Sequence, residues 1–162
     1  MDTPIHLGAF VVDYLKKLAD GIPDDLLDDQ AAPGMHSPRW LLGHLAMAQA
    51  YGVVLLGGKP ASPKEWMKAF GPGSEPTSKP DPAPSKEEIL AVIEKDHAAL
   101  VALIRSATPE KLAGPHGFGP MEKHAPTMAD FIAHLMTTHA ASHLGQLSAW
   151  RRLRGLPAVL GF

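Results

Sequence analysis

Apolar residues recur every three or four positions in four long stretches of the chain, with polar residues between them. This spacing places the apolar side chains on one face of an α-helix. The four stretches are residues 3–20, 37–56, 85–106 and 127–155. The pattern therefore predicts four amphipathic helices packed around a shared core, an all-α fold.

Residues that favour helix starts precede each stretch. Thr3 followed by Pro4 predicts the first start, and Ser37 followed by Pro38 predicts the second, because proline fits the first position of a helix. Residues 85–88 (Ser-Lys-Glu-Glu) form a capping box, in which the first and last side chains bond to each other's backbone N–H groups. The hydroxyl of Thr127 is expected to cap the fourth helix.

A long connection rich in proline and glycine covers residues 59–84. It contains one predicted short helix at 63–70, with Ser62 as its cap. A link of this length lets the third long helix run parallel to the second, so we expect residues 1–162 to form one four-helix bundle with a crossover and an up-down-down-up topology. Within the link, Glu65, Trp66 and Phe70 either close over a site as a lid, or Trp66 and Phe70 fasten the link to the bundle.

The overall composition excludes several classes of protein. The 162 residues are 45% hydrophobic, carry a formal net charge of −2 at pH 7 and include no cysteine. This charge argues against a nucleic-acid partner, because such proteins usually carry a strong basic excess. Without cysteine there can be no disulfide, zinc–thiolate site or cysteine nucleophile. No signal-like start or uninterrupted apolar run of about 18 residues occurs, so we expect a cytoplasmic protein that does not contact a membrane.

Two histidines share one face of the fourth predicted helix. His139 and His143 are four positions apart, which separates them by about 40° around an α-helix and lets both imidazoles bind one metal ion. Gln146 lies between them in angle, one turn later, where its amide can hold a ligand, a substrate or a water molecule. His134 points about 140° away on the same helical geometry, so it is not expected to be a ligand.

A third histidine, His44, lies on the apolar face of the second predicted helix. Two inward faces that carry histidines can meet in the core of a bundle. One histidine facing a pair on another helix supplies three nitrogen ligands and leaves positions on the ion open for water or substrate. The alternative is that all three are core histidines whose polar atoms are satisfied by other groups.

Three motifs surround these histidines. They are "LLGHLA" around His44 with Trp40 before it, "HxxxHLGQL" from His139 to Leu147, and "WRRLRGLP" at residues 150–157. In these motifs the chain resembles the DinB-like superfamily of metal-binding four-helix bundles. The segment "EWMKAFGPGSEP" at residues 65–76 is also similar to a glycine-rich segment that some branches carry between helices two and three.

The resemblance implies that His44, His139 and His143 hold a divalent metal ion, commonly nickel or zinc. In some branches it also implies transfer or isomerisation of a small-molecule substrate that depends on a low-molecular-weight thiol such as bacillithiol, mycothiol or glutathione. Because this chain has no cysteine, the thiol would have to come from the substrate. Members of the family often pair, so a homodimer is also expected.

Other polar residues on the predicted helices have open roles. Asp96 falls in the apolar stripe of the third helix, where a carboxylate needs a partner. It either orients a metal-bound histidine or pairs with an arginine such as Arg39. His97, at the edge of that stripe, is a candidate fourth ligand. His116 is expected to be exposed.

Two functional classes remain open. A metal-dependent enzyme would use the ion to lower the pKa of a bound water or thiol, or to polarise a carbonyl. A zinc protease is excluded, because Ala140 stands where that motif requires glutamate. A non-catalytic bundle would use the ion for structure, sensing or dimerisation, and a fourth protein ligand would favour that class.

Overall fold

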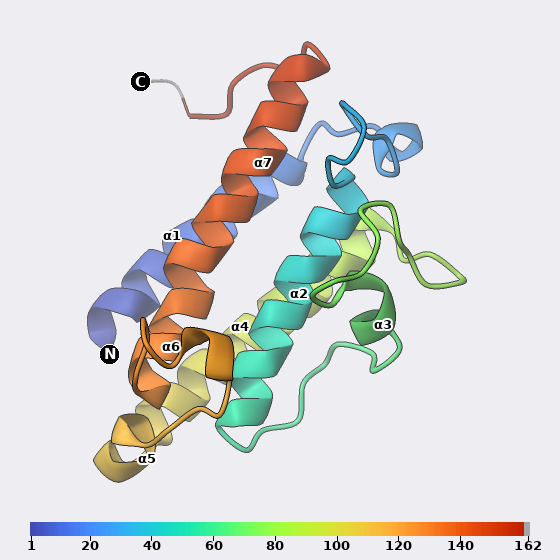
Figure 1. The fold of residues 1–162 in the computed structure, drawn as a ribbon. Helices are drawn as coiled ribbons and strands as arrows, with labels where there is room; N and C mark the ends of the chain where they lie inside the picture. The colour runs from blue at the N-terminus through green and yellow to red at the C-terminus, as the bar shows by residue number, and fades with distance from the viewer. Residues whose placement is uncertain (161–162) are drawn as a thin grey trace.

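The computed structural model describes residues 1–160, and these contain helices but no β-strand. The predicted all-α fold is therefore confirmed (Figure 1). The α-helices, in chain order, are α1 (Asp2–Ala19), α2 (Pro38–Leu55), α3 (Trp66–Phe70), α4 (Lys86–Ser106), α5 (Pro109–Ala113), α6 (Met128–His134) and α7 (Ala140–Leu153). Two 3-10 turns, η1 (Asp24–Leu26) and η2 (Gly119–Met121), lie in the connections, and a π-helical turn, η3 (Leu135–His139), joins α6 to α7.

Four long helical segments form the bundle: α1, α2, α4 and the continuous run from α6 to α7. Helix α2 packs on α4, while α1 packs on η3 and α7. Figure 1 shows α2 and α4 running in the same direction and α1 and α7 running in the opposite one. The crossover between α2 and α4 carries the chain back to the starting end, as the up-down-down-up prediction requires.

Most predicted helix starts are confirmed. The Ser37 hydroxyl accepts a hydrogen bond from the Trp40 N–H at 3.2 Å. Capping boxes join Ser85 to Glu88 and Thr127 to Asp130. Two predicted starts are wrong. Helix α1 begins at Asp2, before Thr3. The short helix in the crossover begins only at Trp66, and the Ser62 hydroxyl donates to Asp96 instead of capping it.

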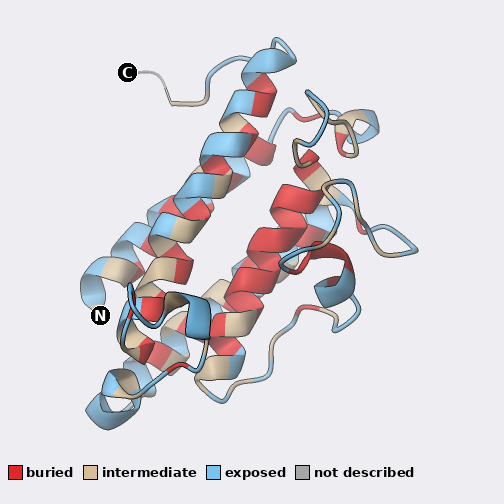
Figure 2. Ribbon diagram, in the orientation of Figure 1, coloured by how far each residue is buried: buried red, intermediate tan, exposed pale blue. Residues whose placement is uncertain are grey.

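Helix α2 is buried on almost all sides (Figure 2). It contacts α3, α4, η3 and α7, and Arg39 is its only charged residue. A helix that is apolar all round belongs in a core. A polar side chain on α2, such as His44, is therefore held in a dry and crowded environment.

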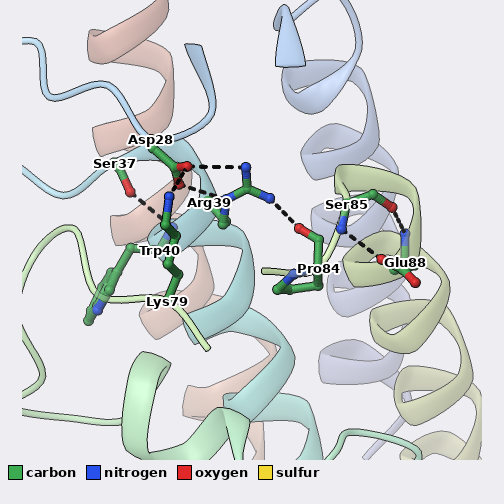
Figure 3. A network of polar contacts seen from close by, with 8 residues as sticks. All are labelled: Asp28, Ser37, Arg39, Trp40, Lys79, Pro84, Ser85 and Glu88. Carbon is green, nitrogen blue, oxygen red and sulfur yellow. Dashed lines mark hydrogen bonds and ion pairs between the residues drawn. The ribbon is translucent and has the colours of Figure 1, made fainter. Parts of the chain in front are cut away.

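Arg39 fastens the start of α2 to two loops (Figure 3). Its Nε lies 2.6 Å from a carboxylate oxygen of Asp28, and its Nη1 donates to the Pro84 carbonyl. Lys79 pairs with the same aspartate at 2.5 Å. This network joins the loop after α1, the end of the crossover and the first turn of α2, so the helix that carries His44 is fixed at its N-terminus.

Among the described helices, none is both long enough and apolar enough to cross a bilayer.

Candidate metal centre

Three histidines from two segments of the bundle converge at one point. His44 comes from the middle of α2, His139 is the last residue of η3, and His143 lies in the first turn of α7. One ring nitrogen from each lies within 4.8 Å of the other two. They form the one such group of potential metal ligands among the described residues. The structure therefore brings together the three histidines that the sequence singled out.

The orientation of His44 is set by a backbone carbonyl. Its Nδ1 lies 2.7 Å from the carbonyl oxygen of Phe70, and the residue is only 7% exposed. Because a carbonyl can only accept, Nδ1 carries the proton and Nε2 presents a lone pair. This is the arrangement in which a histidine binds a metal ion through one nitrogen and is held by the other.

Gly43 makes this contact possible. A Cβ atom at this position would lie 2.4 Å from the ring of Phe70, far inside van der Waals contact. Glycine therefore lets α3 approach α2 closely enough for the Phe70 carbonyl to reach His44.

His143 is oriented by Gln146. Its Nδ1 lies 3.1 Å from the Gln146 Oε1, the acceptor atom of the amide, so Nδ1 carries the proton and Nε2 is free to bind an ion. The sequence placed Gln146 beside the histidine pair, and the structure puts it there. Its proposed role in holding a metal ligand stays a prediction.

The distance between His44 and His139 fits a shared metal ion. Their Nε2 atoms are 3.2 Å apart. Two nitrogens bound at about 2.0–2.1 Å to one tetrahedral zinc ion lie about 3.3 Å apart. The buried Nδ1 of His139 has no hydrogen-bond partner among the described residues. With a proton on Nδ1, the Nε2 lone pairs of His139 and His44 face each other across 3.2 Å, and a cation between the two rings would remove their repulsion.

The environment keeps the three imidazoles uncharged. Burial, followed by the neighbouring imidazoles of His143 and His36, lowers the pKa of His44 to about 4 although its bond to the Phe70 carbonyl acts in the opposite direction. Burial and the surrounding histidines lower the pKa of His139 to about 3. Burial also lowers the pKa of His143, against the effect of Gln146. At neutral pH all three therefore present lone pairs, as metal ligands must.

The π-helical turn corrects one prediction. Residues five apart share a face in a π-turn, whereas the prediction for His134 assumed the α-helical angle of about 100° per residue throughout. His134 consequently lies beside His139, with ring centroids 5.7 Å apart, instead of pointing away. As expected, it is not among the three grouped ligands. Its Nδ1 lies 2.7 Å from the Thr138 Oγ1, which leaves Nε2 for another partner.

The structure gives Asp96 different partners from those expected. Its side chain is 1% exposed, and its two oxygens accept hydrogen bonds from the Ala61 N–H at 2.6 Å, and from the N–H and hydroxyl of Ser62 at 3.2 and 2.6 Å. The carboxylate thus fastens the crossover to α4 and orients no histidine. The suggested pairing with Arg39 is also wrong, since that guanidinium bonds to Asp28.

His97 and the crossover aromatics lie outside the histidine group. The His97 ring packs against Gly8 of α1, where a Cβ would be 3.2 Å from its Cε1, and it is not one of the grouped ligands. Trp66 and Phe70 are buried in the core, which favours the fastening role over the lid, while Glu65 is exposed.

Two further histidines lie in aromatic or buried surroundings. His36 stacks on Trp40 with centroids 3.7 Å apart, and Trp40 stacks on His44 at 4.6 Å. Helical periodicity does not predict this stack, because His36 precedes α2. His116, expected to be exposed, is buried, and its Nε2 bonds to the Ala125 carbonyl at 2.8 Å.

A cavity of about 530 Å³ adjoins the centre, and His44 and His139 form part of its wall. Clefts of this size beside convergent polar groups are typical of small-molecule sites.

Comparison with known proteins agrees with this geometry. The family model of the DinB superfamily matches residues 10–147, a span that includes all three histidines. A search of curated proteins gives no match. The chain belongs to the DinB superfamily.

Proposed function

We propose that this protein is an enzyme that depends on a divalent metal ion, with nickel or zinc as the favoured ions, and acts on a small molecule. The observation that carries the proposal is the convergence of three neutral imidazole nitrogens, with two of the rings, His44 and His139, in the wall of a cavity. Three protein ligands are typical of catalytic sites, because the remaining positions on the ion stay open. When bound, the ion would lower the pKa of a water or thiol, or polarise a carbonyl.

The protein's own residues have distinct parts in this proposal. His44, His139 and His143 would bind the ion through uncharged rings, leaving its positive charge largely uncompensated. The Phe70 carbonyl and Gln146 would hold two of those rings in place. His134 lines the cavity next to His139 and can exchange a hydrogen bond with a bound molecule through Nε2.

Among possible reactions we favour transfer or isomerisation that uses a thiol supplied by the substrate. Hydrolysis is the second reaction type that we consider. The family likeness supports thiol chemistry, and the lack of cysteine requires an external thiol. A non-catalytic metal module is the alternative. A structural metal site would usually have a fourth protein ligand. The candidate, His97, packs against α1, and no fourth histidine joins the group within residues 1–160, which counts against the non-catalytic module.

The proposal is tested by comparing metal-loaded and metal-free protein. Each form would be assayed for displacement of chloride from 1-chloro-2,4-dinitrobenzene by an added thiol and for hydrolysis of 4-nitrophenyl acetate. We expect turnover only with metal, loss of turnover in His143→Ala, and normal turnover in His6→Ala, a matched change at an exposed histidine of α1. Bound metal with no turnover in either assay, or equal turnover in His143→Ala, would favour the non-catalytic module.

A further inference from the structure

The cavity beside the histidines has an almost entirely apolar wall. Helix α2 contributes one face through residues 44, 47, 48 and 51, and the opposite side comes from η2, α6 and η3. Two residues of the crossover, Met67 and Pro72, complete the rim. No lysine, arginine, aspartate or glutamate lines this cavity among the described residues. Its polar groups are histidine rings and the hydroxyl of Tyr51.

Aromatic side chains form a continuous patch on this wall. The ring of Phe131 lies 5.4 Å from that of Phe118 in a stacked arrangement, and both rings contact Tyr51 at 6.0 and 6.3 Å. His116 stacks on Phe131 at 4.2 Å and is itself fixed by the Ala125 carbonyl. The patch is therefore preformed, and a flat apolar group can pack on it without rearranging the wall.

Three methionines add an adaptable surface. Met47, Met67 and Met121 line the cavity on different elements. The unbranched thioether side chain adjusts to ligands of different shape and packs well against aromatic rings. The wall therefore selects for apolar character more strongly than for one particular shape.

The lack of charged side chains in the wall disfavours ligands that carry carboxylates. A carboxylate moved from water into an apolar cavity without a cationic partner loses far more hydration energy than it recovers. Since no lysine or arginine of the described residues lines the cavity, the metal ion would supply the positive charge, and the ligand's donor group would already occupy it. Glutathione, which has two carboxylates, is a poor match to this cavity.

We infer that the occupant of this cavity is a small uncharged molecule with an aromatic or branched aliphatic body and a single metal-binding donor group, such as a thiol. The inference rests on the proposed function for the donor end, because that end requires the metal ion. The apolar end rests on the cavity alone.

The test compares three thiols on cobalt-loaded protein. Cobalt(II) reports thiolate binding through a charge-transfer band, and the thiols are 3-phenylpropane-1-thiol, 2-mercaptoethanol and glutathione. We expect the phenyl compound to bind at least about tenfold more tightly than 2-mercaptoethanol, because its apolar surface is removed from water. Glutathione should bind no more tightly than 2-mercaptoethanol. Equal affinities for all three, or a preference for glutathione, would overturn the inference.

Cavity variants link the effect to the wall. Ala48→Leu fills the cavity from α2 and should abolish the advantage of the phenyl compound while leaving the cobalt spectrum unchanged. Ala98→Leu, a matched change at an exposed position of α4, should retain it. Because Ala48 is buried, Met121→Trp at the half-buried η2 provides a second filled cavity if Ala48→Leu does not fold. Retention of the advantage in a folded, filled variant would contradict the inference.

A metal-free arm separates this inference from the proposed function. Butylbenzene has no donor group, and its binding to metal-free protein can be followed by ligand-observed NMR. Binding that disappears in the filled variant supports the apolar cavity even if no cobalt is taken up, a result that would overturn only the proposed function. No binding of butylbenzene to the metal-free wild type would overturn the cavity inference even where cobalt binds.

Discussion

Burial keeps the three histidines uncharged, and this lowers the free energy of unfolding at acidic pH. The pKa values of His44 and His139 in the folded protein are about 4 and about 3, well below the ordinary value of 6.5. Burial lowers the pKa values of the neighbouring imidazoles His36 and His134 as well. Between pH 6.5 and the folded value, the unfolded chain therefore binds protons that the folded chain does not.

The metal-free protein should consequently lose stability as the pH falls from about 6.5 towards 4. The sign follows from the lowered folded pKa: the unfolded state gains protons first, so acid favours unfolding. The free energy of unfolding should fall by up to about 1.4 kcal/mol per pH unit for each such histidine. Denaturant unfolding at several pH values measures this. The slope should be shallower in His44→Gln, which cannot titrate, and equal slopes would contradict the assignment.

Gln146 allows a second test at a single residue. Gln146→Ala removes the acceptor for Nδ1 of His143, and loss of such a partner typically weakens metal binding about 10- to 100-fold. Zinc affinity measured by competition with a chromogenic chelator should show this loss, with little change in stability because the side chain is exposed. Gln146→Glu keeps an acceptor and should retain the affinity. Unchanged affinity in Gln146→Ala would show that His143 needs no such support.

The sequence predicts the three histidines well but their surroundings less well. Each histidine lies mid-stripe on its helix, so burial and convergence follow from helical periodicity. Asp96 is different, because its partners depend on the path of the crossover loop, which periodicity does not describe. His36 reaches the site through a loop for the same reason.

At the level of elements, the contact between α2 and α3 controls the orientation of His44. Gly43→Ala would place a methyl group 2.4 Å from the fully buried ring of Phe70. Overpacking of this kind costs about 1–3 kcal/mol, and displacement of α3 would withdraw the carbonyl from His44. We therefore expect lower stability and weaker zinc binding together.

Gly145 supplies the matched control for this variant. It lies on the exposed face of α7, and a Cβ there would meet nothing within 4 Å. Gly145→Ala should stabilise the protein by up to about 1 kcal/mol through helix propensity. Thermal unfolding of both variants makes the comparison. Equal effects of the two substitutions would contradict a specific role for Gly43.

The π-turn η3 is the element that helical periodicity missed. Thr137 bonds through Oγ1 to the Ala133 carbonyl at 2.5 Å, an interaction typical of disturbed helical backbone. A prediction that uses one fixed angle per residue does not include the extra residue of a π-turn. It therefore placed His134 on the wrong face of the helix. It placed His139 and His143 correctly because the helix is regular from one to the other.

Thr137→Val tests the support of this turn. Valine keeps the shape of threonine and removes the hydroxyl, so loss of the hydrogen bond should lower the free energy of unfolding by about 1 kcal/mol. Urea unfolding measures the change. A variant as stable as the wild type would show that η3 does not depend on this hydroxyl.

Over the whole molecule, long-range polar contacts hold the irregular segments to a regular bundle. Asp96 holds the crossover, and Arg39 ties two loops to the start of α2. Arg151, near the end of α7, donates to the carbonyls of Leu18 and Asp20 at the end of α1. The helix order and topology could be predicted from periodicity and link length, whereas these contacts could not. The homodimer and the cytoplasmic location stay predictions.

The most direct test of the central claim is the metal content of the protein after loading with zinc or nickel. Elemental mass spectrometry on untagged protein should find close to one ion per chain in the wild type and in His6→Ala. The ion should be lost in each of His44→Ala, His139→Ala and His143→Ala, provided circular dichroism shows that the variant is folded. A wild-type protein that takes up neither metal, or folded variants that keep it, would contradict the three-histidine centre.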